Sequence, residues 1–256
     1  MREVAARVGS ARRLIARTAE RVGLVTDPNA HVALVIAAHP DDGDFGCAGY
    51  VAQLAAKGWS VHFLVCTNGA KGTADRNMPR ERLIALRQEE QREACRRMGV
   101  KEVTFLDNED GELVYDRRLL EQLVRAIRVI RPNTVLTHDP TDIIIQNSFI
   151  NHPDHRATGT AALDAVYPTA RDHLNFPEHL AEGIEPHKVR EVLVWNSNQP
   201  NFDVDISAEV EAKINALTAH VTQFADRRGF TRYVRKAWKA EDGRYLERFR
   251  RIEVDF

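Results

Sequence analysis

Short apolar runs alternate with longer amphipathic segments along most of the chain. The runs are rich in β-branched residues, which is typical of strands buried on both faces. They read HVALVIAA (31–38), SVHFLVCT (60–67), EVTFL (102–106), TVLTH (134–138) and EVLVWN (191–196). Helical spacing is found between them, at residues 49–58, 80–98, 116–131 and 153–167. This alternation predicts an α/β fold, with a Rossmann-like, doubly wound, mostly parallel sheet and helices on both faces.

The domain organisation follows from the absence of any repeat or low-complexity linker. We expect residues 31–256 to form a single domain, whose last ~50 residues add a mixed helical and strand segment. Residues 1–30 are expected to form a basic helical arm, because residues 1–21 carry six Arg and two Glu. An organellar transit peptide has a similar composition. We favour a surface helix, which is a candidate contact in a homo-oligomer.

Charge and composition narrow the range of partners. The 36 basic and 37 acidic residues give a net charge of -1, so no global field attracts nucleic acid or an anionic membrane. No apolar run is long enough for a membrane span, and the N-terminus lacks the apolar core of a secretory signal. The three cysteines lie scattered in apolar segments, as expected of reduced core residues: Cys47, Cys66 and Cys95. These features together predict a cytoplasmic protein.

Two clusters of His and Asp follow the first and the fourth predicted strand. The first lies in AAHPDDGDFGCAG (37–49) and the second in NHPDH (151–155). Ionised Asp beside a buried strand needs a partner. In the common strand order 3-2-1-4-5 these two strands are neighbours at the point where the order reverses, which is where ligands bind. The clusters should therefore face each other with six candidate residues: His39, Asp41, Asp42, His152, Asp154 and His155.

These residue types suit metal-assisted hydrolysis. Two imidazoles and one carboxylate can hold a catalytic zinc ion and leave one position open for water. Such an ion lowers the pKa of bound water to about 7. Another carboxylate can then accept the proton of the water, while another histidine stabilises an oxyanion or protonates a leaving group.

The two clusters resemble the motifs of the PIG-L (LmbE-like) family of metal-dependent N-deacetylases. Four further segments are similar to family blocks in the same order: TNGAKGT, RQEEQREACRRMG, DNEDGEL and KINALTAHVTQF. The resemblance implies one Zn²⁺ per chain, held by His39, Asp42 and His155, although this ligand set also suits other divalent metals. It also implies a small-molecule substrate of the N-acetylglucosamine type, from which an acetyl group is removed.

Roles for the remaining residues are likewise implied by the resemblance. Asp41 corresponds to the general base, and His152 to the group that stabilises the oxyanion or protonates the amine. Asp154 would orient a histidine of the site or tune its charge. Arg87 and Asp110 match positions that contact the sugar.

Two departures from the family pattern leave the substrate open. Gly43 stands where Glu is frequent, and Ile150 stands where some sugar deacetylases have Tyr. An amidase acting on a glucosamine-containing thiol conjugate would use the same metal site. Arg87 could instead form an ordinary solvated pair with Glu90 on a helix.

Two alternatives belong to a different functional class. Glycines at 43, 46 and 49 follow a strand, so a dinucleotide could bind there, but the spacing is not G-x-G-x-x-G. Adjacent aspartates would also repel a pyrophosphate. A catalytically silent metal-binding protein is the second alternative, and it would bind zinc without releasing acetate.

Overall fold

A seven-stranded sheet runs through the computed structural model, which describes residues 31–224 and 226–254. The predicted arm at residues 1–30 lies outside the described residues. In chain order the strands of the sheet are β1 (Val32–Ala37), β2 (Ser60–Thr67), β3 (Glu102–Asn108), β4 (Thr134–His138), β7 (Glu191–Trp195), β8 (Phe202–Asp205) and β9 (Leu246–Glu253). Their order in space is β3-β2-β1-β4-β7-β9-β8.

The pairing confirms the predicted strand order. β1 pairs in parallel with β2 on one side and with β4 on the other, and β2–β3 and β4–β7 are parallel too. With β7 as the fifth predicted strand, the order is 3-2-1-4-5. The C-terminal segment is more closely integrated than expected, because β9 pairs antiparallel with both β7 and β8 and extends the main sheet.

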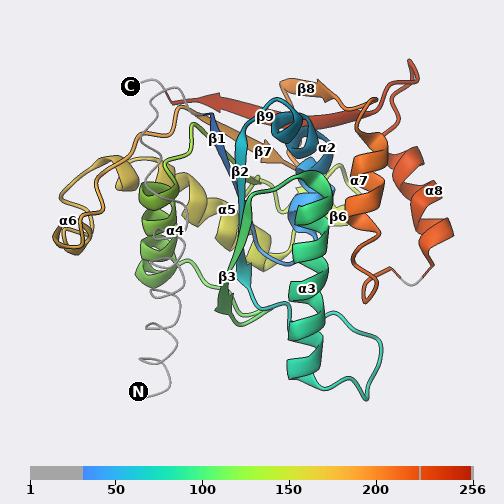
Figure 1. The fold of residues 1–256 in the computed structure, drawn as a ribbon, viewed down its shortest axis with the longest axis horizontal. Coiled ribbons are helices and arrows are strands. Elements are labelled where there is room, and N and C mark those ends of the chain that lie inside the picture. Colours follow the sequence, from blue (N-terminus) through green and yellow to red (C-terminus); the bar gives the residue numbers. More distant parts are fainter. Residues whose placement is uncertain (1–30, 225, 255–256) are drawn as a thin grey trace.

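Helices cover both faces of the sheet (Figure 1). One apolar core lies under α4 (Arg117–Ile130) and α5 (Pro153–Val166). The second lies on the opposite face, where its side chains come from α2 (Asp42–Ala56), α3 (Arg80–Met98) and α7 (Val210–Leu217). The doubly wound arrangement predicted from the alternation is thus confirmed, and all three cysteines are buried.

Three glycines let α2 lie close to the sheet. A Cβ on Gly43 would lie 2.7 Å from Phe63, and one on Gly46 would lie 2.4 Å from the ring of Trp195. Gly49 is in similar contact with Ile206. The glycines therefore face packed side chains, which disfavours the dinucleotide alternative because a pyrophosphate needs open backbone there.

Smaller elements complete the described chain. After β4 a hairpin of β5 (Ile144–Ile145) and β6 (Phe149–Ile150) leads into α5. The others are the short helices η1 (Thr169–Arg171) and α6 (Glu178–Ala181), and α8 (Arg227–Ala237). Among the helices of residues 31–224 and 226–254, none has the length and apolar character required to cross a membrane.

Candidate metal and catalytic site

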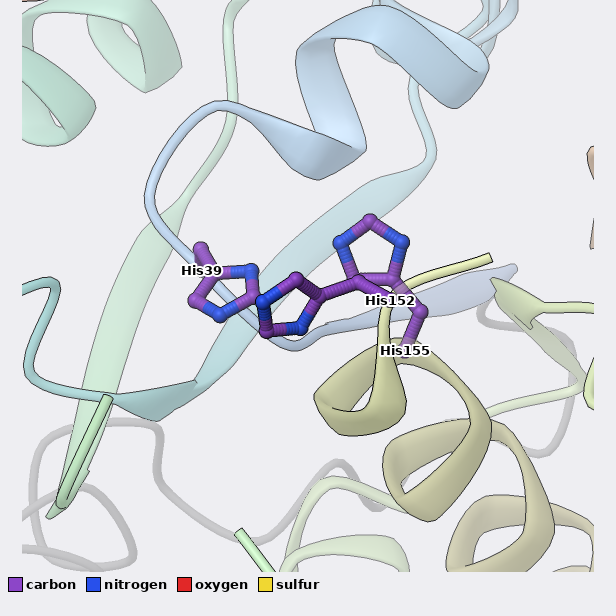
Figure 2. A group of neighbouring side chains, drawn as sticks. All are labelled: His39, His152 and His155. Carbon is purple, nitrogen blue, oxygen red and sulfur yellow. The ribbon is translucent and has the colours of Figure 1, made fainter. Parts of the chain in front are cut away.

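The two His and Asp clusters meet at the carboxyl ends of β1 and β4. His39 lies in the turn between β1 and α2, whereas His152 caps α5 and His155 lies in its first turn. Figure 2 shows their three imidazoles converging from these two segments. The ring centroid of His39 is 4.9 Å from that of His152 and 5.2 Å from that of His155. The parallel β1–β4 pair therefore unites residues 113 positions apart in sequence, from 39 to 152.

Asp42 lies at the centre of the cluster. Its Oδ2 accepts a hydrogen bond from the backbone N–H of His39 at 2.7 Å and lies 3.2 Å from Nδ1 of the same residue. Its Oδ1 lies 3.1 Å from Nε2 of His155. The three ligands implied by the sequence are thus neighbours in space. Donors around a tetrahedral zinc with bonds of about 2.1 Å lie about 3.4 Å apart, so the His39–Asp42 and Asp42–His155 separations, which end on different oxygens of Asp42, are each of that order.

Carboxylates surround His39 on its other side. Its Nε2 lies 3.0 Å from Oδ2 of Asp154 and 3.2 Å from Oδ1 of Asp110. Although burial opposes the charged ring, these carboxylates and Asp42 raise the pKa of His39 to about 12. Three acidic groups around one ring favour a cation at this place, and a divalent metal would meet that demand.

Metal-binding donors are grouped in three overlapping sets among the described residues. In each set the candidate ligand atoms lie within 4.8 Å of one another. The sets are His39, His152 and His155; Asp42, His138 and His155; and His39, Asp110 and Asp154. Imidazole nitrogens and carboxylate oxygens, which make up these sets, are ligands that zinc accepts.

His152 is held in one tautomer by the start of α5. Its Nδ1 accepts a hydrogen bond from the backbone N–H of Asp154 at 3.1 Å. Burial and the nearby charge of His39 lower the pKa of His152, which favours the neutral ring that accepts at Nδ1. Since Nδ1 carries the lone pair, the proton is on Nε2, which can donate.

Asp154 connects the cluster to the turn after β3. It accepts hydrogen bonds from the backbone N–H of Gly111 at 2.7 Å and of Leu113 at 3.2 Å, besides its contact with His39. Its contact with His39 is thus fixed from two sides, and its role in orienting that histidine stays a prediction.

Asp41 lies between His39 and Asp42, at the N-cap position of α2, where its side chain makes no capping hydrogen bond. Its carboxylate lies 3.6 Å from Nη2 of Arg87. Burial and the neighbouring Asp42 raise the pKa of Asp41 to about 6, against the opposing effect of Arg87. A carboxylate with a raised pKa is a better proton acceptor in a hydrolytic site than a fully solvated one.

The guanidinium of Arg87 donates its hydrogen bonds chiefly to backbone carbonyls around the site. The guanidinium donates from Nη2 to the carbonyl of Pro40 at 2.8 Å and from Nη1 to those of Gly69 and Lys71. Asp110 lies 3.6 Å from Nη1 of Arg87 and accepts from the backbone N–H of Lys71. Both residues are at the site, and their contact with a sugar stays a prediction.

His138 and Trp195 support the cluster from the sheet. The indole N–H of Trp195 donates to Nδ1 of His138 at 3.1 Å, and Nε2 of His138 lies 3.4 Å from Asp42. The ring of His138 stacks on His155 with centroids 4.2 Å apart. Nothing in the sequence distinguishes Trp195 from an ordinary core aromatic at the end of a strand, so its hydrogen bond was not foreseen.

A buried ion pair fills a break in α2. Cys47 has non-helical dihedrals (φ -148°, ψ 16°), so the helix hydrogen bonds are interrupted there. Lys213 and Glu247 meet at this point, 2.7 Å apart and with no exposed side-chain surface. Lys213 donates to carbonyls before the break, and Glu247 accepts from amides after it. The carbonyls belong to Asp44 and Phe45, and the amides to Gly49 and Tyr50.

Comparison with known proteins shows that the chain is similar to deacetylases. Residues 34–166 match the model of the family described as PIG-L, GlcNAc-PI de-N-acetylase. A diacetylchitobiose deacetylase of Thermococcus kodakarensis is 34% identical over 193 residues, which cover 75% of this chain and 70% of the relative. A probable N-acetyl-alpha-D-glucosaminyl L-malate deacetylase 2 of Bacillus subtilis is 31% identical over 198 residues, or 74% of this chain and 82% of the relative.

A solved structure extends the similarity over nearly the whole fold. The N,N'-diacetylchitobiose deacetylase of Pyrococcus horikoshii, in complex with its inhibitor MPG, has a TM-score of 0.78 and 28% identity. The similarity covers 96% of this chain and 92% of that chain.

Proposed function

Because the chain belongs to the PIG-L family of de-N-acetylases, we propose that it removes the acetyl group from an N-acetylglucosamine-type sugar in a zinc-dependent hydrolysis. The observation that carries this proposal is the meeting of the two HPD clusters in three overlapping sets of His and Asp donors, each of which joins residues of both clusters. The relatives named for diacetylchitobiose and for the malate conjugate both act on N-acetylated glucosamine sugars, which supports the same substrate class here.

His39, Asp42 and His155 would hold the zinc ion. When bound, the ion supplies a positive charge that polarises the amide carbonyl and acidifies a water molecule. Asp154 and Asp110 hold the ring of His39 from its far side, which fixes the orientation of this ligand.

Asp41 and His152 would carry the proton and the developing charge. Asp41 accepts the proton of the attacking water as the new C–O bond forms at the amide carbon. The N–H at Nε2 of His152 donates to the carbonyl oxygen as it becomes negative. The C–N bond then breaks, and Asp41 returns its proton to the departing amine. The hydrogen bond that Nδ1 accepts from Asp154 leaves Nε2 as the donor, and the lowered pKa of His152 favours this oxyanion role over that of a proton donor.

Metal content and acetate release test the proposal together. The purified protein is freed of metal with a chelator, reloaded with one equivalent of zinc, and assayed on a panel of N-acetylated glucosamine sugars. We expect zinc-dependent acetate release from at least one sugar. Zinc binding without acetate release from any sugar would reject the deacetylase, and a parallel series of longer acyl groups would reveal an amidase.

A further inference from the structure

The backbone of Asp41 adopts a conformation that its neighbours must maintain. With φ 101° and ψ -27°, Asp41 lies on the positive-φ side, which residues with a side chain seldom occupy. Such conformations persist where the surrounding structure over-determines them. This dihedral also sets the direction in which the Asp41 side chain leaves the turn, so whatever maintains it also aims the carboxylate.

Gln91, on α3, holds this backbone directly. Its side-chain oxygen accepts a hydrogen bond from the backbone N–H of Asp41 at 2.8 Å. Its side-chain nitrogen donates to Oδ2 of Asp44 at 2.9 Å. Gln91 is only 1% exposed, so water does not compete for these bonds. The two contacts fix which end of the amide faces Asp41.

Asp44 is in turn fixed by His220, which follows α7. Nε2 of His220 lies 2.9 Å from the same Oδ2 of Asp44, and both residues are fully buried. Side chains from three separate elements therefore form a chain of hydrogen bonds that ends at the backbone N–H of Asp41: the turn after α7 provides His220, α2 provides Asp44, and α3 provides Gln91.

We propose that Gln91, Asp44 and His220 are positioning residues that aim the carboxylate of Asp41 at the attacking water. This inference rests on the proposed function, in which Asp41 accepts the proton of the water. None of the three donates to or accepts from the metal ligands His39 and His155 in the described structure. Their loss should slow the chemical step and leave zinc and sugar binding nearly unchanged.

The first variant is Gln91→Leu, which removes both hydrogen bonds at similar volume. We expect kcat to fall about 10- to 100-fold, in line with the loss of a correctly placed base, with KM and the zinc Kd within about threefold of the wild type. The matched control is Gln88→Leu, one turn earlier on α3, where the side chain donates to Asp107 away from Asp41. The control should retain wild-type kcat.

If Gln91→Leu folds poorly, a second pair of variants tests the same role by exchanging the donor and the acceptor in the hydrogen bond between residues 91 and 44. Gln91→Glu keeps the acceptor for Asp41 but sets a carboxylate against that of Asp44, so kcat should fall at least about tenfold. Adding Asp44→Asn provides N–H donors to both Glu and His220. Nδ1 of His220 has no hydrogen-bond partner in the described part of the chain, so the ring can change tautomer to accept. The double variant should recover most of the lost kcat.

The outcomes separate this inference from the proposed function. Two results would overturn the positioning role only, provided that the wild type is active. One is a normal kcat in Gln91→Leu, and the other is a double variant whose kcat is no higher than that of Gln91→Glu alone. A wild type that binds zinc but releases no acetate would overturn the proposed function and this inference with it. A parallel loss of zinc affinity and kcat in Gln91→Leu would also reject positioning, because it would indicate collapse of the metal site.

Discussion

At the scale of single residues, burial and neighbouring charges together set the pKa values of the two carboxylates that follow His39 and Pro40. Asp41 and Asp42 are adjacent in sequence, yet their pKa values move apart: burial and Asp42 raise that of Asp41 to about 6, whereas the surrounding histidines hold that of Asp42 below its usual range against the effect of burial. Two neighbouring carboxylates thereby acquire different tasks. Under the proposed function, the lowered pKa suits Asp42 to act as an ionised ligand, and the raised pKa suits Asp41 to accept a proton.

Replacing Asp41 with Asn tests this division. Asn keeps the size of the side chain but cannot accept a proton, so we expect kcat to fall at least about 100-fold while zinc stays bound. Zinc titration and acetate release on the same preparation measure both effects. Loss of zinc in Asp41→Asn, or kcat above half of the wild-type value, would contradict the assigned role.

A second residue-scale prediction concerns pH and stability. His62 on β2 is buried, and burial together with Lys101 lowers its pKa to about 4. Its unfolded pKa is about 6.5, so between pH 6.5 and 4 the unfolded chain binds more protons. The free energy of unfolding therefore decreases as pH falls through this window, by at most about 3.5 kcal/mol at about 1.4 kcal/mol per pKa unit.

Urea unfolding at pH 7.5 and pH 5 measures this effect. His62→Gln retains a polar group for the contact with Ser60 but does not titrate in this range. We expect the stability of the variant to depend less on pH than that of the wild type. Equal pH dependence in both proteins would show that His62 is not the titrating group.

At the scale of elements, α2 is the helix that forms the site. Its glycines bring it against the sheet, and its break at Cys47 separates a first turn carrying Asp42 and Asp44 from a second, regular part. Polar groups freed by the break need partners in the buried interior, and Lys213 and Glu247 supply them. The geometry of the site thus depends on side chains from α7 and β9.

Gly46→Ala should disturb both the packing and the site. The added methyl would lie 2.4 Å from the ring of Trp195, so the indole must move away from His138. We expect a loss of about 1–3 kcal/mol in unfolding free energy and weaker zinc binding. Ala56→Ser, at the exposed end of the same helix, is the control and should change neither quantity. Wild-type zinc affinity in Gly46→Ala would show that the position of Trp195 does not affect zinc binding.

Lys213→Met tests the ion pair in the break. It leaves the buried carboxylate of Glu247 without its partner, and breaking such a pair costs about 3–5 kcal/mol. The exposed pair of Arg235 and Glu211 offers a matched control, since Arg235→Met should cost under about 1 kcal/mol. Chemical denaturation of both variants measures the difference. A similar small effect in both would mean that the break in α2 tolerates an unpaired carboxylate.

At the scale of the whole molecule, much was predictable from the sequence. The apolar runs marked the five parallel strands, and the order 3-2-1-4-5 placed the two HPD clusters together. The strands could be predicted because a buried strand is encoded by a local run of apolar residues. The meeting of the clusters could be predicted because the strand order is common to doubly wound folds. The place of β9 between β7 and β8 was not foreseen, because its sequence LERFRRIE is mostly charged and has neither the apolar run nor the two-residue alternation typical of a strand.

The supporting contacts of the site could not be predicted in the same way. Gln91 lies in a highly charged helix, where a buried glutamine and a surface glutamine look alike in sequence. Trp195 ends an apolar strand, where an aromatic residue is ordinary. Their hydrogen bonds to Asp41 and His138 arise from tertiary packing of elements 50 or more positions apart, which no local pattern encodes.

The bond between Glu247 and the amide of Gly49 has a consequence for biogenesis. The two residues are 198 positions apart, and Glu247 belongs to the last strand of the sheet. While the chain is being synthesised, the early HPD segment leaves the ribosome long before the partner that completes its helix. His39 and Asp42 are therefore made before the side chain that completes their helix, and under the proposed function we expect tight zinc binding only after β9 has been synthesised.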